Sequence, residues 1–216
     1  MLSNWIAWSP QLFQGLGVSL TLAGLALLFG LPLGLVLALA SSTRAKQIRY
    51  TAITTVEIGR GAPALVVLQM VYYGLPAVGM TAGSFASAAT ALALTTGAYT
   101  SEILRAGLNA VPQREIEAGW ALGMTHRDIL RFVVIPQGIL FAVPALMGFA
   151  ILIFQATALT FTIAIPELLA RAYRIGAATY LYLDVLALAG VFYLAVTIPL
   201  GWLVSYTESR LSSHLG

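Results

Sequence analysis

Long apolar runs alternate with short polar segments along this chain of 216 residues. An α-helix rises about 1.5 Å per residue, so a run of about 20 apolar residues crosses a hydrocarbon layer about 30 Å thick. The pattern predicts an all-α integral membrane protein with about five transmembrane helices, forming a single domain over residues 1–216. The predicted spans are residues 12–40, 52–76, 85–104, 136–165 and 180–206.

Small and polar residues interrupt the predicted spans. Pro144 is expected to break the fourth span and Pro166 to end it. The next segment, residues 167–179, is amphipathic with Arg171 and Arg174 on one side, and we expect it to lie along the outer surface of the membrane. The first span carries glycines at positions that allow close contact between helices, which are Gly15, Gly17, Gly24, Gly30 and Gly34.

Composition favours a membrane location, because 59% of the residues are hydrophobic and only 9% are charged, with a mean hydropathy of +0.89. A soluble domain carries about 25% charged residues. The N-terminal sequence MLSNWIAWSPQ lacks a basic segment, so the first apolar run is expected to be a retained span and not a cleaved signal peptide. Cysteine is absent, which excludes disulfides and thiolate metal sites.

The distribution of basic residues predicts the orientation in the membrane. Residues 41–50 form a short basic loop, and loops rich in lysine and arginine stay in the cytoplasm. The N-terminus is therefore expected outside and the C-terminus in the cytoplasm. Arg171 and Arg174 oppose this assignment, but the basic residues on the inner side outnumber them. Those residues are Arg44, Lys46, Arg49, Arg105, Arg114, Arg127, Arg131 and Arg210.

One long charged stretch, residues 112–136, separates the third and fourth spans. Pro112 suits a first helical position, because its missing N–H group has no partner there in any case. Glu115 and Glu117 follow in the first turns, where the helix dipole favours negative charge. A short helix is therefore expected to begin at Pro112.

A bend is predicted after this first helix. Gly123 can adopt the positive φ of a tight turn, and the spacing of Thr125 and Asp128 is that of a capping box. The second helix is expected to be short and to end before Pro136. Soluble helix-turn-helix proteins that bind DNA show a similar pattern. The apolar composition of the rest of the chain excludes that interpretation, and nucleic acid is not an expected partner.

Charged side chains lie inside the second span and at the end of the third. A charge at membrane depth is costly and tends to face a partner or a water-filled cavity. Arg60 precedes a glycine and a proline that loosen the backbone, so we expect it to line a translocation path or to hold a gate closed through Glu57 or Glu102. Glu102 and Arg105 are expected to form an ion pair at the inner end of the third span.

Three uncharged polar residues are further candidates for the path. Gln69 lies in the second predicted span, and Gln155 and Thr157 lie in the fourth. Gln155 and Thr157 have an equally good structural interpretation, because polar side chains inside membranes commonly bond to the backbone or to a neighbouring helix.

The sequence gives no sign of intrinsic catalysis. It contains no phosphate-binding glycine loop, no paired catalytic carboxylates and no Ser/His/Asp set. The histidines are His126 and His214, which are too few and too poorly placed for a metal site. We therefore expect neither catalytic residues nor a bound metal.

The charged stretch resembles the cytoplasmic loop of the permease subunits of type I ABC importers. That loop carries Glu-Ala-Ala, three residues, glycine, nine residues, an aliphatic residue, one residue and Leu-Pro. The departures here are a glycine, a valine and an isoleucine, all small or isosteric changes, and the spacing is kept. The matching residues are Glu117, Ala118, Gly119, Gly123, Val133, Ile135 and Pro136.

Three further motifs resemble the branch of these permeases that takes up polar amino acids. Arg60-Gly61-Ala62-Pro63 stands in place of Arg-Gly-Thr-Pro, Ala98-Tyr99-Thr100-Ser101-Glu102 in place of Ala-Tyr-x-x-Glu, and Ile135-Pro136-Gln137 in place of Leu-Pro-Gln. The fourth span departs from the branch. It has Gly148 where asparagine is usual, and Gln155-Ala156-Thr157-Ala158-Leu159 where the branch shows Lys-Asp-Thr-Ser-Leu. Whether this subunit itself holds the substrate is therefore open.

The resemblance implies an ATP-driven importer of amino acids in the bacterial inner membrane. The chain would form the translocation path with a second permease, either the same chain or a related one, and would receive substrate from an extracytoplasmic solute-binding protein. Its loop, about residues 105–135, would couple it to a dimer of ABC ATPases. ATP and Mg²⁺ would bind to that ATPase, and no cofactor to this chain. The coupling residues would be Glu117, Ala118, Gly119, Gly123 and Pro136.

A second class of function is compatible with the residues alone. A membrane sensor or interaction protein would also present a charged cytoplasmic loop, and would dock a partner there without moving a solute.

Overall fold

The computed structural model describes residues 2–215, with the side chains of residues 4–211. The chain is helical in this range and forms no strand there. The elements are α1 (Leu2–Ser41), α2 (Lys46–Gly61), α3 (Ala64–Ala77), α4 (Ser84–Asn109), α5 (Gln113–Ala121), α6 (His126–Ile129), the π-helical η1 (Leu130–Val134), α7 (Ile135–Ala156), the 3₁₀-helical η2 (Thr157–Ile163), α8 (Leu168–Thr179) and α9 (Tyr182–Leu215).

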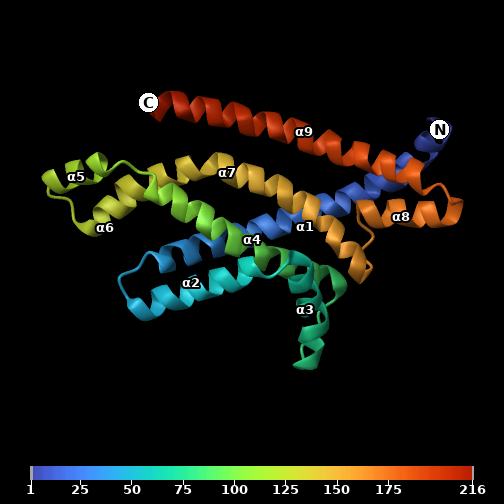
Figure 1. Cartoon of the computed structure of the whole chain (residues 1–216), viewed down its shortest axis with the longest axis horizontal. Coiled ribbons are helices and arrows are strands. Elements are labelled where there is room, and N and C mark those ends of the chain that lie inside the picture. Colours follow the sequence, from blue (N-terminus) through green and yellow to red (C-terminus); the bar gives the residue numbers. More distant parts are fainter. Residues whose placement is uncertain (1, 216) are drawn as a thin grey trace.

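Four long helices, α1, α4, α7 and α9, run along the longest dimension of the molecule (Figure 1). Helix α4 packs against both α1 and α7, and α9 packs against α7 and α8. The α5–α6 segment lies at one end of this bundle, and α8 lies with the N-terminus at the other. The main core joins α1, α3, α4, α7 and η2 through buried side chains that include Leu22, Leu68, Leu92, Phe149 and Ile163.

The contact between α1 and α4 depends on missing side chains. A Cβ atom at Gly30 would overlap the Thr96 side chain, and one at Gly34 would overlap the Thr100 hydroxyl. Close packing of this kind suits membrane helices, whose association relies on van der Waals contact and interhelical hydrogen bonds. The prediction for the first-span glycines is confirmed here and at Gly15, whereas Gly17 and Gly24 face open space with no atom within 4 Å.

Three helical stretches in the described part of the chain are long and apolar enough to cross a membrane. They are Asn4–Ser41, His126–Ile163 and Tyr182–Leu211, and a fourth is present if α2 and α3 are taken together. Helix α4 is long but contains several hydroxyl side chains, most of them buried in the bundle. Thr96, Thr100 and Ser101 donate to carbonyls of their own helix, as Thr96 does to the Leu92 carbonyl at 2.7 Å, whereas the Ser87 and Thr95 hydroxyls have no partner in the described chain. The five-span count stays a prediction.

The second predicted span is not a single helix. The axes of α2 and α3 differ by 102°, with the break at Ala62 and Pro63, both of which are extended. Proline lacks a backbone donor, and its ring disfavours helical geometry in the residue before it. The proline therefore ends α2 at Gly61 and turns the chain into α3.

The fourth predicted span is continuous where we expected breaks. Helical structure runs from His126 to Ile163 through α6, η1, α7 and η2, so the second short helix is in fact the start of a long one. Pro136 lies in the first turn of α7, after a widened π turn in which the Ile135 N–H donates to the Leu130 carbonyl. The π turn admits the proline without a kink, and α7 also continues through Pro144. The first helix, α1, begins about ten residues before the predicted span.

The amphipathic segment after the fourth span forms α8, as predicted. It does not lie free on a surface, because it buries Leu168, Ala172 and Ile175 in a cluster with residues of α1 and α9. Figure 1 shows α8 running beside these two helices, along the bundle and not across its end. Its apolar face is thus part of the protein interior.

The α1–α4 contact gives a test of the fold. Gly34→Val places a side chain where Thr100 and the Gly97 carbonyl already lie, so it should destabilise the protein by about 1–3 kcal/mol. Thermal unfolding of the purified protein in detergent measures this as a lower midpoint. Gly24→Val is the matched control on the same helix, because its Cβ meets no other atom. Equal midpoints for the two variants would contradict the packing described here.

Candidate functional site

The α5–α6 segment forms a compact bend at one end of the bundle (Figure 1). Helix α5 starts one residue later than predicted, because Pro112 is the extended residue before its first turn. Glu115 lies in that first turn, where it complements the helix dipole. The start of α5 thus follows the sequence signals closely.

Gly123 ends α5 in the way its sequence position predicted. Its φ is 75°, a left-handed conformation that side chains with a Cβ adopt rarely. The Met124 N–H donates to the Gly119 carbonyl at 3.1 Å, and the Gly123 N–H donates to the Trp120 carbonyl at 2.9 Å. These two bonds form a Schellman motif, which satisfies the last carbonyls of α5 and fixes the direction of the chain.

The second half of the bend begins with the predicted capping box. The Asp128 N–H donates to the Thr125 hydroxyl at 3.3 Å, and the Thr125 N–H donates to the Asp128 carboxylate at 3.2 Å. Gly119 is buried against Ile129, since a Cβ at Gly119 would lie 2.9 Å from Ile129 Cγ1. The glycine that replaces an alanine of the loop signature therefore brings α5 and α6 close together.

The outer side of this bend is open to a partner. Glu117 and Ala118 are exposed, and the apolar side chains of Trp120 and Leu122 are 50% and 82% exposed. Together with the stacked Trp120 and His126 rings, these residues form a surface of one acid and several apolar groups on a rigid turn. Such a surface suits docking and contains no catalytic arrangement.

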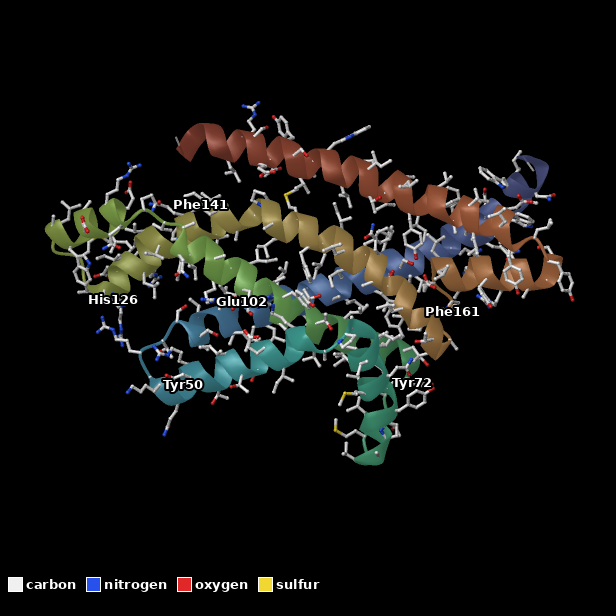
Figure 2. The ribbon with its side chains drawn as sticks, in the orientation of Figure 1. Tyr50, Tyr72, Glu102, His126, Phe141 and Phe161 are labelled. Carbon is white, nitrogen blue, oxygen red and sulfur yellow. The ribbon has the colours of Figure 1, made fainter. Side chains whose placement is uncertain are left out.

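A partly exposed charge cluster joins α2 to α4. Arg105 donates to both carboxylate oxygens of Glu102, at 2.9 Å from Nε and 2.6 Å from Nη2. Arg60 Nη1 lies 3.6 Å from Glu102 Oε2, so the carboxylate is shared by two guanidinium groups. Figure 2 shows Glu102 on α4, well away from the end marked by His126. The predicted Glu102–Arg105 pair is confirmed.

Tyr99 connects this cluster to the break between α2 and α3. Its hydroxyl donates to the Arg60 carbonyl at 3.2 Å, and the Arg60 guanidinium lies 5.8 Å from the centre of its ring. On its other side the ring stacks on Phe149 of α7. Tyr99 had no role predicted from the sequence, although it belongs to the Ala98–Glu102 motif, because only the fold brings it beside Arg60.

The other candidate residues share no hydrogen bond or ion pair with this cluster, although the charge of Glu57 still acts on Arg105. Glu57 is exposed and has no basic group within 4 Å in the described chain. Gln69 on α3 donates to the Thr162 hydroxyl of η2 at 2.8 Å. Gln155 is exposed, and the buried Thr157 hydroxyl donates to the Phe154 carbonyl of its own helix at 2.7 Å. The Thr157 hydroxyl thus makes the hydrogen bond to the backbone that a purely structural role predicts.

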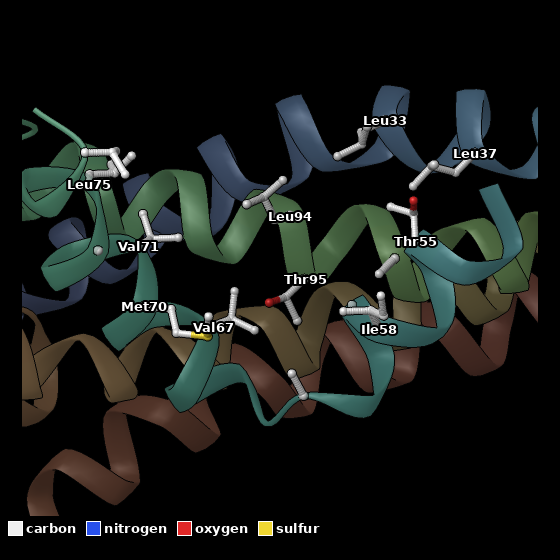
Figure 3. A pocket seen from close by; sticks show the side chains of 15 residues that line it. Leu33, Leu37, Thr55, Ile58, Val67, Met70, Val71, Leu75, Leu94 and Thr95 are labelled. Atoms are coloured by element: carbon white, nitrogen blue, oxygen red, sulfur yellow. The ribbon is translucent and has the colours of Figure 1, made fainter. Parts of the chain in front are cut away.

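A cavity of about 550 Å³ lies beside the break, between α1, α2, α3 and α4 (Figure 3). Leu33, Ile58, Val67 and Leu94 are among the side chains that line it, and Thr55 and Thr95 are its only polar ones. None of its lining side chains is charged, so none could pair with the amino or carboxylate group of an amino acid. The cavity therefore suits apolar groups and not the polar end of an amino acid.

Comparison with known proteins shows which family this chain belongs to. The sequence pattern of the family described as binding-protein-dependent transport system inner membrane component matches residues 30–213. The chain belongs to this family.

Two relatives align with almost the whole permease. The arginine transport system permease protein ArtQ of Bacillus subtilis (strain 168) is 32% identical over 206 residues, which cover 95% of this chain and 94% of ArtQ. The histidine/lysine/arginine/ornithine transport system permease protein HisM of Escherichia coli (strain K12) is 34% identical, covering 96% of this chain and 94% of HisM.

Solved structures agree with the sequence relatives. A crystal structure of an amino acid ABC transporter with histidines contains a chain with a TM-score of 0.92 and 34% identity, covering 97% of this permease and 98% of that chain. A chain of the MetNI methionine ABC transporter in an inward-facing conformation gives a TM-score of 0.67 at 20% identity, over 92% of this permease and 95% of that chain, which shows the shared fold.

The protein is therefore a membrane permease subunit of an ABC importer with the type I fold, an inner membrane component. ATP hydrolysis in such importers belongs to a separate ATPase subunit, so the permease itself is not the enzyme.

The charge cluster gives a second prediction. Glu102→Gln leaves Arg105 and Arg60 without a counter-charge and should lower stability by about 1 kcal/mol, since the partial exposure of the pair reduces the contribution of a charged hydrogen bond. The thermal unfolding midpoint in detergent should fall. Glu208→Gln removes an exposed acid from α9 that makes no ion pair in the described chain and should leave the midpoint unchanged. If both variants unfold alike, Glu102 does not hold this cluster together.

Proposed function

We propose that this permease carries amino acids inward as part of a complex with a second permease, an ABC ATPase dimer and an extracytoplasmic solute-binding protein. The names of its relatives support the substrate class, because ArtQ and HisM are permeases for arginine and for several basic amino acids and histidine. The exposed, rigid α5–α6 bend is the observation that carries the proposal, since a permease without ATP chemistry needs a surface that receives motion from its ATPase.

The proposed topology has five spans, with the N-terminus outside and the C-terminus in the cytoplasm. In this topology α2 and α3 together form the second span, and α4 forms the third despite its hydroxyl groups. Buried hydroxyls that bond within the helix do not face lipid, so they add little cost to a span. The α5–α6 bend then lies in the cytoplasm with the ATPase.

Helix α4 provides a direct mechanical link from the ATPase to the path. It ends at Asn109, and α5 begins four residues later at Gln113, so a displacement of α5 pulls on the end of α4. Glu102 lies two turns before that end. Motion of α4 would separate Glu102 from Arg60, which belongs to α2 and faces the α2–α3 break.

We propose that the Arg60–Glu102 pair latches this break in the resting permease. Arg60 is about eight residues inside the predicted second span, roughly 12 Å from its inner end, where an unpaired charge is costly. The 3.6 Å separation is long for an ion pair, and Arg105 already satisfies Glu102, so Arg60 can leave at moderate cost. A released Arg60 would also be available to a substrate carboxylate, which is the second role the sequence allowed.

Exchanging the charge of the docking surface tests the proposed coupling. Glu117→Lys should reduce amino acid uptake by proteoliposomes of the whole complex at least tenfold and weaken co-purification of the ATPase. The reason is that the variant would present a positive charge to the ATPase where the wild type presents a negative one. The permease should still unfold at the wild-type temperature, since Glu117 is exposed. Glu208→Lys, at an exposed position of α9, is the control.

Normal ATPase recovery and uptake with Glu117→Lys would show that α5 is not the docking helix. An ATPase that binds the wild-type permease while no amino acid is taken up would instead favour a sensor or interaction protein.

Removing the guanidinium of Arg60 separates the two roles proposed for it. If Arg60 is a latch, Arg60→Ala should raise ATP hydrolysis in the absence of the solute-binding protein by up to about fivefold, the effect of a half-exposed ion pair. If it binds substrate, uptake should fall while hydrolysis stimulated by the solute-binding protein persists. Lys46→Ala, at the exposed start of α2, is the control. Unchanged uptake and hydrolysis in Arg60→Ala would contradict both roles.

A further inference from the structure

A basic pocket lies at the opposite end of the bundle from the α5–α6 bend. It has a volume of about 330 Å³ and is formed by the first turns of α1 and one side of α8. Arg171 and Arg174 line it together with the amide of Gln11 and the indole ring of Trp8. The pocket thus offers the hydrogen-bond donors of two guanidinium groups and one amide beside an aromatic wall, and no acid lines it.

No acid of the described chain neutralises these arginines. The ion pairs found there both involve Glu102, so neither Arg171 nor Arg174 has a carboxylate within 4 Å. Arg171 donates from Nε to the Pro166 carbonyl at 3.1 Å, which leaves its terminal nitrogens available. The acid nearest in sequence, Glu167, makes no ion pair with Arg171 and instead accepts hydrogen bonds within the protein.

Those hydrogen bonds hold the pocket wall in place. The buried Glu167 carboxylate accepts from the Ala170 N–H at 2.7 Å, from the Ser19 hydroxyl of α1 at 3.4 Å and from the Tyr193 hydroxyl of α9 at 3.3 Å. Gly15 of α1 adds a close contact, since a Cβ there would lie 2.9 Å from Arg171 Cδ. Helix α8 is thus fixed between two long helices, with its arginines presented from a rigid support.

The pocket lies at the predicted outer edge of the membrane. Gln11 directly precedes the first predicted span, and Thr179, which also lines the pocket, directly precedes the fifth. Large apolar side chains near both edges are exposed, with Phe13 62% and Leu183 82% accessible. Such side chains suit contact with lipid, so the pocket opens at the level of the headgroups.

We propose that this pocket binds the phosphate-containing headgroup of an anionic phospholipid in the outer leaflet. Arginine recognises phosphate oxygens with paired hydrogen bonds, and the two cations favour a lipid with a net negative charge over a zwitterionic one. The bound lipid supplies the missing counter-charge, which accounts for two arginines at an end where the positive-inside rule disfavours them. The leaflet assignment rests on the proposed orientation, whereas the binding itself does not.

The exposed apolar surroundings favour lipid over an acidic side chain of the solute-binding protein as the occupant. A protein partner would need its own apolar surface to cover Phe13 and Leu183 as well as an acid to reach the pocket. Acyl chains cover both without further requirements.

Lipid titration of the purified, delipidated complex in detergent tests the proposal. Dioctanoyl phosphatidylglycerol should raise the unfolding midpoint of the permease in a saturable way and remain bound in native mass spectrometry, at least tenfold more tightly than dioctanoyl phosphatidylcholine. Each basic group near an anionic headgroup contributes about fivefold in affinity, so Arg171→Gln/Arg174→Gln should weaken this binding about 30-fold. Arg127→Gln/Arg131→Gln, with two exposed arginines at the other end, should bind the lipid as the wild type does.

Several results would overturn the proposal. Equal binding of the two lipids, or wild-type binding by the Arg171/Arg174 double variant, would exclude a specific headgroup site. Stabilisation by inorganic phosphate alone to the same midpoint would assign the pocket to a free anion. If the double variant binds lipid normally but loses stimulation of ATP hydrolysis by the solute-binding protein, the arginines dock that protein. The unfolding midpoint of Arg171→Lys/Arg174→Lys without lipid checks that α8 stays folded. Lipid binding is measured without transport, so the test is independent of the proposed function.

Discussion

The structure depends on satisfying polar groups inside an apolar bundle. In hydrocarbon there is no water to bond a free donor or acceptor, so each polar side chain needs a partner within the protein. Helix α4 shows the consequence: three of its buried hydroxyls donate to backbone carbonyls, as Thr100 does to the Thr96 carbonyl at 2.7 Å. Glycines on α1 bring the two helices close enough to exclude lipid from these groups. Of the buried hydroxyls of α4, those of Thr96, Thr100 and Ser101 are satisfied in this way, whereas those of Ser87 and Thr95 have no hydrogen-bond partner in the described chain.

The irregular turns of the chain lie beside the candidate site residues. The break after Gly61 sets Arg60 against α4, and the π turn before Ile135 connects the α5–α6 bend to α7. The 3₁₀ segment η2 gives Gln69 its partner, Thr162.

The two ends of the molecule differ in their chemistry. One end presents the α5–α6 bend, with an exposed acid and exposed apolar groups on a rigid turn. The other presents two unpaired arginines on α8, which the Glu167 hydrogen bonds fix to α1 and α9. Between them, the Arg60–Glu102 contact lies on α4, the helix that leads directly into the bend. The two ends of this permease thus differ in charge, and Glu102 between them takes part in both ion pairs of the described chain.

The sequence by itself determined the local features of this protein. The apolar runs predicted a helical membrane protein, Gly123 and the Thr125–Asp128 spacing predicted the bend, and the loop signature identified the family, because each of these signals acts over a few residues. Tertiary structure decided the rest. Pro63 breaks a span while Pro136 does not, since the outcome depends on whether the neighbouring turn can widen. Arg60 selects Glu102 and not Glu57, because only packing of α2 on α4 sets which carboxylate is within reach.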